Sequence, residues 1–129
     1  MVVDTSALAA ILFDEPEREV FIGALAEAPR VLVSTGTVLE ATMVVESRLG
    51  EHGGRELDLF LHRAGAEVVP LDHEHVELAR EAWRRFGKGR HPAALNMGDL
   101  FSYALARTTG EPLLFKGEDF SRSDIVSAL

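Results

Sequence analysis

The most informative segment of the chain is Val2-Val3-Asp4-Thr5-Ser6-Ala7, in which two apolar residues are followed directly by an acid and two hydroxyl residues. A short apolar run without polar alternation is typical of a strand that is buried on both faces of a parallel sheet. The segment therefore predicts a buried first strand at Val2-Val3. Asp4 follows the end of that strand and can cap a helix that begins near Ser6.

Further apolar runs predict the other strands of the same sheet. We expect strands at Val31-Leu32-Val33, Val68-Val69 and Leu113-Leu114-Phe115, and a last short strand near Ile125-Val126. Pairs of helical patterns separate the first four strands, which gives the order β-α-α-β-α-α-β-α-α-β. Parallel strands joined by crossover helices follow from that order, so the predicted fold class is α/β.

Apolar residues repeated at helical spacing mark the helices. Three such stripes are Phe21, Ala24, Leu25 and Ala28; Leu57, Phe60, Leu61 and Ala64; and Val76, Ala79, Trp83 and Phe86. Residues 37–49 and 96–109 also have helical patterns, and the second segment is apolar nearly all round, which predicts deep burial. Glycines stand where helices should end, at Gly50, Gly65 and Gly110.

The composition indicates a folded domain and excludes several kinds of site. With 129 residues, of which 47% are hydrophobic, the chain fits one domain that spans residues 1–129. It has no cysteine, which excludes disulfide frameworks, thiolate zinc sites and cysteine nucleophiles. Neither a signal peptide nor an apolar run of about 20 residues is visible, so we expect a cytoplasmic protein.

The net charge of −8 opposes binding to nucleic acid, which relies mainly on Lys and Arg. Two features offset this objection. Metal ions can reverse the local sign of an acidic site, and the basic residues crowd into one segment, with Arg80, Arg84, Arg85, Lys88 and Arg90 next to His91. That segment is either a solvated helix face and loop, or an RNA contact formed by Arg84, Arg85, Lys88 and Arg90.

Four acids from distant parts of the chain are expected at one edge of the sheet, namely Asp4, Glu40, Asp99 and Asp119. Ligands of an open parallel sheet bind beyond the carboxyl ends of its strands. Asp4 and Asp119 follow strands, and Glu40 and Asp99 lie in the first turns of helices that begin at the same edge. Each acid alone has a plainer explanation, as an N-cap, a turn residue or the last member of a capping box that begins at Thr37 or Asn96.

Together, the four acids predict a cation site. Two carboxylates about 5 Å apart repel by roughly 3 kcal/mol at an effective dielectric near 20, so three or four cannot all stay ionised unless protons or cations bind. Oxygen ligands suit Mg²⁺ or Mn²⁺, and such a site can deprotonate water and stabilise displacement at phosphorus. Thr5 and Ser6 add hydroxyls that could hold a metal-bound water, although Ser6 is equally a helix cap.

In this order and spacing, the motifs resemble the PIN-domain family, in particular its VapC-type toxins from bacterial toxin–antitoxin pairs. The resemblance rests on Asp4-Thr5-Ser6-Ala7, Glu40, Asn96-Met97-Gly98-Asp99 and Leu114-Phe115-Lys116-Gly117-Glu118-Asp119-Phe120, and it covers essentially the whole chain. It implies a three-layer sandwich with helices on both faces of a mostly parallel sheet of strand order 3-2-1-4-5. It also implies an endoribonuclease that uses Mg²⁺ or Mn²⁺.

The same resemblance implies roles for individual residues. Asp4 and Asp99 would be direct metal ligands, and Glu40 and Asp119 would ligate through water or help to activate the nucleophile. The last position varies in the family, and Glu118 and Asp124 stand nearby, so Asp119 is chosen by its register with Lys116-Gly117. Lys116 either contacts a phosphate or is simply exposed at a strand end.

The partners implied by the resemblance are an RNA substrate, a second copy of the chain in a homodimer, and a small antitoxin. The antitoxin often places a basic side chain in the acidic pocket, and the negative charge of this chain suits such a partner.

The sequence opposes three alternatives. A phosphate-accepting receiver domain needs adjacent acids after the first strand and an acceptor after the third, whereas this chain has Asp4-Thr5 and Pro70-Leu71-Asp72. His73 and His75 do not share a helical face and lack a third ligand, so no zinc site is predicted. A catalytically inactive PIN-like module that binds RNA or protein is opposed by the presence of all four acids.

Overall fold

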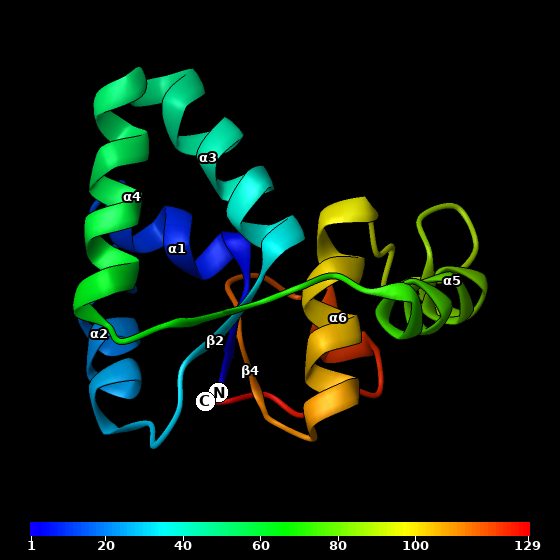
Figure 1. Ribbon diagram of the computed structural model, residues 1–129. Coiled ribbons are helices and arrows are strands. Elements are labelled where there is room, and N and C mark those ends of the chain that lie inside the picture. The colour runs from blue at the N-terminus through cyan, green and yellow to red at the C-terminus, as the bar shows by residue number, and fades with distance from the viewer.

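The computed structural model describes residues 1–129 as a parallel sheet between two groups of helices (Figure 1). The strands are β1 (Val2–Val3), β2 (Leu32–Ser34), β3 (Glu67–Val69) and β4 (Leu113–Leu114). The helices are α1 (Thr5–Leu12), α2 (Arg18–Glu27), α3 (Thr35–Leu49), α4 (Glu51–Arg63), α5 (His73–Phe86), α6 (Met97–Thr109) and the short 3₁₀ helix η1 (Phe120–Arg122). The predicted fold class and the predicted order of strands and helix pairs are confirmed.

Alternation along the strands creates two cores, one on each face of the sheet. Val3, Val33 and Leu114 face a core that also contains residues of α1, α2, α3 and α4. Their neighbours Val2, Leu32 and Leu113 face the second core, to which α5 and α6 contribute. Successive side chains of a strand point to opposite faces, so strands of two or three residues are enough to serve both cores.

The four strands are parallel and lie in the order β3-β2-β1-β4. The expected fifth strand near Ile125-Val126 is reduced to an isolated parallel bridge between Leu113 and Ser127. Leu113 donates its N–H to the Val126 carbonyl and accepts from the N–H of Ala128, both at 2.9 Å. The fifth position of the sheet is thus filled by the C-terminal segment, but only one residue of the short strand β4 pairs with it.

Two expectations about burial are corrected. β3 is an edge strand, and its Val68 is 46% exposed, so this strand is not buried as the apolar run predicted. Helix α5 packs into the core through Ala82 and Phe86, whereas Val76 and Trp83 of the predicted apolar stripe are 39% and 37% exposed. Helix α6 is buried along Ser102–Ala106, as expected.

The helix ends agree with the glycine positions. Gly50 and Gly110 end α3 and α6 with φ angles of +70° and +74°, and Gly65 follows the end of α4 with a φ of +64°. None of the helices is both long and apolar enough to span a membrane.

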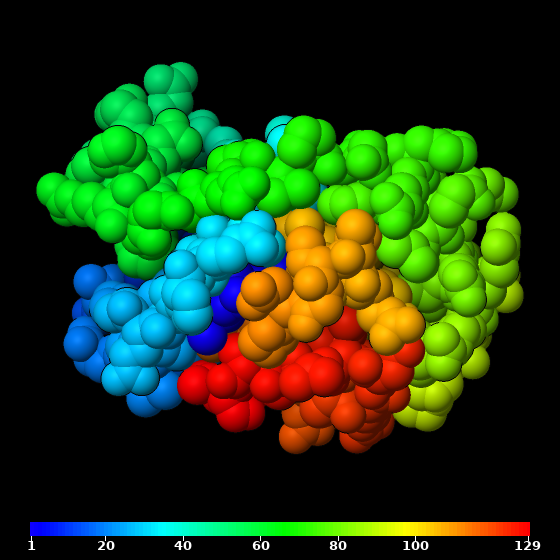
Figure 2. Space-filling view, turned by 60° about the horizontal axis from the view of Figure 1, so that its bottom comes forward, coloured from blue at the N-terminus to red at the C-terminus, as the bar shows by residue number.

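The N-terminus of the chain lies at the amino edge of the sheet. The Met1 ammonium donates to the Arg30 carbonyl at 2.9 Å and pairs with Glu111 at 2.6 Å. Figure 2 shows this edge, with the N-terminal segment enclosed by the cyan, orange and red segments of the chain. The opposite, carboxyl edge of the sheet carries the acids.

Candidate active site

A pocket of about 290 Å³ lies at the carboxyl edge of the sheet and gathers all four predicted acids. Asp4 enters it from the end of β1, Glu40 from α3, Asp99 from α6 and Asp119 from the segment after β4. The hydroxyl residues Thr5 and Ser6, together with Asn96 and Lys116, complete its polar lining. We call this cavity the acid pocket.

Asp4 is the most buried of the four acids, with 3% of its surface exposed. It caps α1, because its Oδ2 accepts hydrogen bonds from the Ser6 N–H at 3.0 Å and the Ser6 hydroxyl at 2.7 Å. Its Oδ1 accepts from the Ser102 hydroxyl at 2.6 Å. Burial raises the pKa of Asp4, and the hydrogen bonds from Ser102 and Ser6 oppose that rise. The capping role therefore coexists with a place in the pocket.

Ser102 is a pocket-supporting residue that the sequence analysis missed. It is fully buried in α6, and its oxygen lies 3.3 Å from the Thr37 hydroxyl as well as next to Asp4. A signal was present in the sequence, since Ser102 follows Asp99 by three residues and three-residue spacing places two side chains on one helix face. The sequence analysis predicted a helix that is apolar nearly all round, and it therefore assigned no polar role to Ser102.

Asp99 has a strongly raised pKa. It forms a capping box with Asn96, in which the Asn96 N–H donates to Asp99 at 2.9 Å and the Asp99 N–H donates to Asn96 at 3.0 Å. Burial raises the pKa of Asp99 to about 7; the Asn96 N–H opposes this, and the charges of Asp4, Asp119 and Glu40 add to it. The carboxylates are therefore close enough to repel one another.

Glu40 occupies a different helical position from the predicted one. Because Ser34 is the N-cap of α3, Glu40 lies in the second turn of that helix, and the capping box expected from Thr37 to Glu40 does not form. Burial raises the pKa of Glu40, the Thr5 hydroxyl beside it lowers the pKa, and the charge of Asp4 raises it. A Cβ built on Gly98 would overlap the Glu40 carboxylate, so the glycine of Asn96-Met97-Gly98-Asp99 makes room for this acid.

Among the acids of the C-terminal segment, only Asp119 lines the acid pocket. Asp124 points elsewhere: it accepts from the Tyr103 hydroxyl at 2.8 Å and lies near Arg85 and Arg107 at 3.5 and 3.8 Å. Glu118 pairs with Arg122 at 3.8 Å. Asp119 itself is exposed and caps nothing with its side chain, so its carboxylate is free to face the pocket entrance.

Lys116 forms ion pairs with two acids that do not belong to the four predicted site acids. Its ammonium pairs with Glu15 and, at 3.2 Å, with Glu17, and these carboxylates raise its pKa. Its backbone N–H donates to the Ser6 hydroxyl at 2.9 Å, which connects the segment after β4 to the Asp4 cap. The side chain is thus neither a simple exposed lysine nor a free cation.

The predicted basic residues lie outside the acid pocket. Arg85 is tied to Asp124 and stacks on Phe86 at 4.6 Å, and the Arg90 guanidinium lies 5.6 Å from the Trp83 ring centroid. Lys88 lines a neighbouring groove, and Arg84 is exposed without an ion pair. His91 accepts from the Ala93 N–H at 3.0 Å and packs edge-on against Phe86, which is a structural role.

The donors of the acid pocket fit a small, hard cation that keeps some of its waters. No three His, Asp or Glu side chains in the structure converge closely enough to enclose an ion by themselves. Mg²⁺ usually binds through one or two carboxylates and retains several waters, so a wider cluster of carboxylate oxygens suits it. The charges of the neighbouring acids add to the raised pKa of Asp99, and a bound cation would relieve that repulsion.

The chain is similar to known proteins along nearly its whole length. Residues 1–126 match the PIN domain family. The chain is 57% identical over 127 residues to the protein named Ribonuclease VapC of Mycolicibacterium smegmatis, covering 98% of each. Its fold is similar to that of Mycobacterium tuberculosis VapC20, described as a Sarcin-Ricin loop cleaving toxin (TM-score 0.79, 21% identity, 97% and 95% covered). It is also similar to a chain of VapBC2 from Rickettsia felis bound to a promoter DNA fragment (TM-score 0.76, 16% identity, 98% and 94% covered).

Proposed function

We propose an active site for this chain, which belongs to the PIN-domain family and is a VapC-type ribonuclease toxin of a toxin–antitoxin system. The proposed site consists of Asp4, Glu40, Asp99 and Asp119. The observation that carries the proposal is their convergence. Four acids that are far apart in the chain line one pocket, and the pKa of Asp99 is raised to about 7 in part by the other three. Such crowding is costly for the fold and suits a site that works on phosphate through a cation.

The cofactor we propose is Mg²⁺ or Mn²⁺, held by Asp4 and Asp99 and, through water, by Glu40 and Asp119. When bound, the cation supplies positive charge at the scissile phosphate and makes a nearby water more acidic. The residues of the chain set the geometry. Ser6 and Ser102 use both oxygens of Asp4, so this carboxylate cannot rotate. The capping box holds one oxygen of Asp99 on the Asn96 N–H.

Glu40 is the residue we propose as general base toward the attacking water. Its carboxylate is half-buried, and burial raises its pKa toward the range in which a carboxylate accepts a proton efficiently. It rests against the Gly98 backbone and beside the Thr5 hydroxyl, which limits where the water can lie. Asp119, which is exposed and also lines the pocket, would help to orient the water.

The proposed partners are RNA as substrate, a second copy of the chain and a small antitoxin with a basic segment. The acid pocket supports the antitoxin, because a Lys or Arg side chain inserted there would relieve the same repulsion as a cation.

A cleavage assay tests the proposal. The purified protein is incubated with a mixed pool of structured RNA in Mg²⁺, in Mn²⁺ and in chelator, beside Asp99→Asn, Asp4→Asn and the control Asp58→Asn, an exposed acid of α4. We expect cleavage that needs a metal ion and both pocket acids, with Asp58→Asn fully active. Cleavage by Asp99→Asn at the wild-type rate would refute the site. Metal binding without cleavage would favour an inactive PIN-like module that binds RNA or protein.

A further inference from the structure

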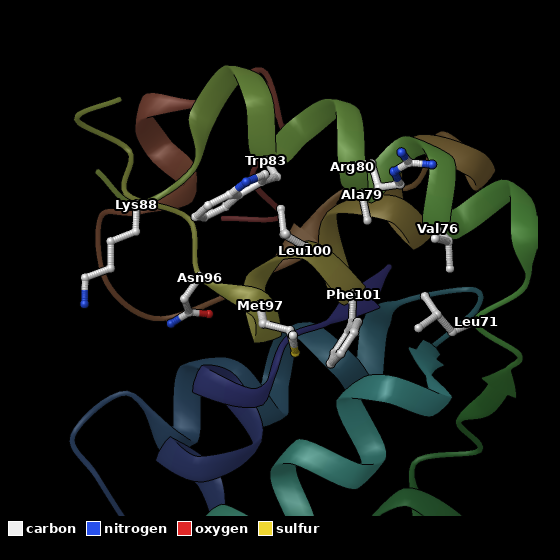
Figure 3. Close-up of a pocket in the computed structure, with 10 residues that line it drawn as sticks. All are labelled: Leu71, Val76, Ala79, Arg80, Trp83, Lys88, Asn96, Met97, Leu100 and Phe101. Atoms are coloured by element: carbon white, nitrogen blue, oxygen red, sulfur yellow. The ribbon is translucent and has the colours of Figure 1, made fainter. Parts of the chain in front are cut away.

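Lys116 is the only basic residue that lines the acid pocket. Its backbone N–H donates to the Ser6 hydroxyl at 2.9 Å, and that hydroxyl donates to the Asp4 carboxylate at 2.7 Å. The only other lysine of the chain, Lys88, lines a neighbouring groove of mostly apolar residues together with Asn96 (Figure 3). The Lys116 ammonium is therefore the internal cation best placed to neutralise the pocket acids.

The Lys116 ammonium nevertheless forms no ion pair with any of the four pocket acids. It pairs instead with Glu15 and, at 3.2 Å, with Glu17. The charges of the other three pocket acids raise the pKa of Asp99, and no lysine charge opposes them. An opposite charge within a few ångströms would stabilise such crowded carboxylates, so the nearest ammonium is kept from the place where it would be most favourable.

The turn between α1 and α2 fixes the two glutamates that pair with Lys116. The Glu15 N–H donates to the Ala10 carbonyl at the end of α1, at 2.9 Å. Pro16 stands between the glutamates and restricts the backbone further. One oxygen of Glu17 is shielded from water, and the cation beside it is the Lys116 ammonium. The glutamates are thus placed by the backbone, and their charges depend on the lysine.

We propose that Glu15 and Glu17 are positioning residues that hold the Lys116 ammonium out of the acid pocket and so keep the pocket open to a metal ion. The inference rests on the proposed function, because it requires the four acids to form a cation site. A lysine side chain is a point charge on a long, flexible stem. Inside the pocket its charge would satisfy the carboxylates that attract the metal ion, and the two glutamates prevent this by binding the same ammonium.

A phosphate of the RNA is the competing partner of Lys116. Two carboxylates beside one ammonium leave this cluster with a net charge of −1, which repels an anion. The same excess of negative charge is favourable for a cation in the adjoining acid pocket. The charge balance therefore supports retention of the lysine by the glutamates and opposes a phosphate contact.

A cycle of four proteins separates this retention from a general effect of charge. Mn²⁺ alone is titrated calorimetrically into wild type, Lys116→Met, Glu15→Gln/Glu17→Gln and the triple variant. We expect the double variant to bind Mn²⁺ about tenfold more weakly than wild type or worse, because its lysine is free to enter the pocket. Lys116→Met should recover most of this loss in the double variant, yet change the affinity of wild type by about threefold at most, so the effects are coupled.

Matched variants remove the same charges elsewhere. Asp14→Asn/Glu19→Gln removes two exposed acids that lie near the same turn and face Arg18, and Lys88→Met removes the other lysine. Both proteins should bind Mn²⁺ within about threefold of wild type, since exposed charges outside the pocket are screened.

The double variant is expected to fold. The side chains of Glu15, Glu17 and Lys116 are 31–39% exposed, and ion pairs of this kind contribute little to stability. Its melting temperature checks this. If the double variant melts early, Glu15→Gln alone, with and without Lys116→Met, gives the same cycle with a smaller expected effect.

Each other outcome overturns the retention of Lys116. Equal effects of Lys116→Met with and without the glutamates would leave only long-range charge, and equal Mn²⁺ affinity in all four proteins would leave the cation site without a guard. Unchanged Mn²⁺ binding together with weaker RNA binding by Lys116→Met in chelator would assign the lysine to a substrate phosphate.

The titrations also distinguish this inference from the proposed function. A wild-type protein that binds no Mn²⁺ would refute the cation site and the retention together. Because the titrations contain no RNA, the expected Mn²⁺ affinities without any RNA cleavage would refute only the catalytic assignment.

Discussion

The Glu40 carboxylate rests against the α-carbon of Gly98, fifty-eight positions later in the chain, so closely that a methyl group on Gly98 would overlap it. The contact joins α3 to α6 at the acid pocket. It explains why the segment Asn96-Met97-Gly98-Asp99 accepts a glycine in the first turn of a helix, where glycine costs up to about 1 kcal/mol relative to alanine.

Gly98→Ala should separate activity from stability. The added methyl group would push Glu40 aside. We expect RNA cleavage to fall at least tenfold, because a positioned general base typically contributes more than tenfold to the rate. The melting temperature should change little, because the Glu40 side chain is flexible and alanine favours the helix. Gly23→Ala in α2, where nothing lies within 4 Å of the new methyl group, is the control and should keep full activity. Unchanged cleavage by Gly98→Ala would argue against a role for Glu40.

The metal-free protein should lose stability as the pH rises from about 4 to about 7. The pKa of Asp99 is 3.8 ordinarily and about 7 in the fold, so the native state binds more protons than the unfolded chain throughout this window. Stability falls with rising pH wherever that holds, and the raised pKa values of Asp4 and Glu40 act in the same direction. Urea unfolding in chelator at several pH values measures the slope. Asp99→Asn should flatten it and be the more stable protein at pH 7; an equal slope in the variant would contradict the assignment.

Mg²⁺ should raise the melting temperature at pH 7 and have little effect at pH 4. At the higher pH the carboxylates of the acid pocket repel one another and a bound cation stabilises the native state by mass action, whereas protons already remove the repulsion at the lower pH. Thermal unfolding at increasing Mg²⁺ concentration tests this, with Asp99→Asn expected to lose most of the shift. An unchanged melting temperature at saturating Mg²⁺ would show that the acids do not form a cation site.

Ser102→Ala should destabilise the fold and slow cleavage together. It removes the hydroxyl that donates to the buried Asp4 at 2.6 Å, and an unsatisfied buried acceptor costs about 1–3 kcal/mol. Ser47→Ala, an exposed serine of α3, is the control and should stay within about 0.5 kcal/mol of wild type. Denaturant unfolding and cleavage rates at saturating Mg²⁺ measure the two effects. A Ser102→Ala protein as stable and active as the control would mean that Ser6 alone orients Asp4.

The positions of the acids could be predicted from the sequence because they depend on connectivity. Once Val2-Val3 and Leu113-Leu114 are assigned as parallel strands, Asp4 and Asp119 must lie at their carboxyl edge, and α6 must begin there and bring Asp99 with it. The start of α3 was predicted less well, because the cap is Ser34 and not Thr37. Several hydroxyl residues precede that helix, and local pattern alone does not choose among them.

What the sequence determined by itself was periodicity and order: the parallel strands, the paired helices and the four acids at one edge. Tertiary structure alone decided which side chains meet. It placed Ser102 on Asp4, Gly98 under Glu40 and Asp119 rather than Asp124 at the pocket, and it left the Val76 and Trp83 face of α5 in solvent. The physical reason is that hydrophobic spacing specifies how one segment folds, whereas contacts between segments depend on the packing of the whole chain, which no local pattern contains.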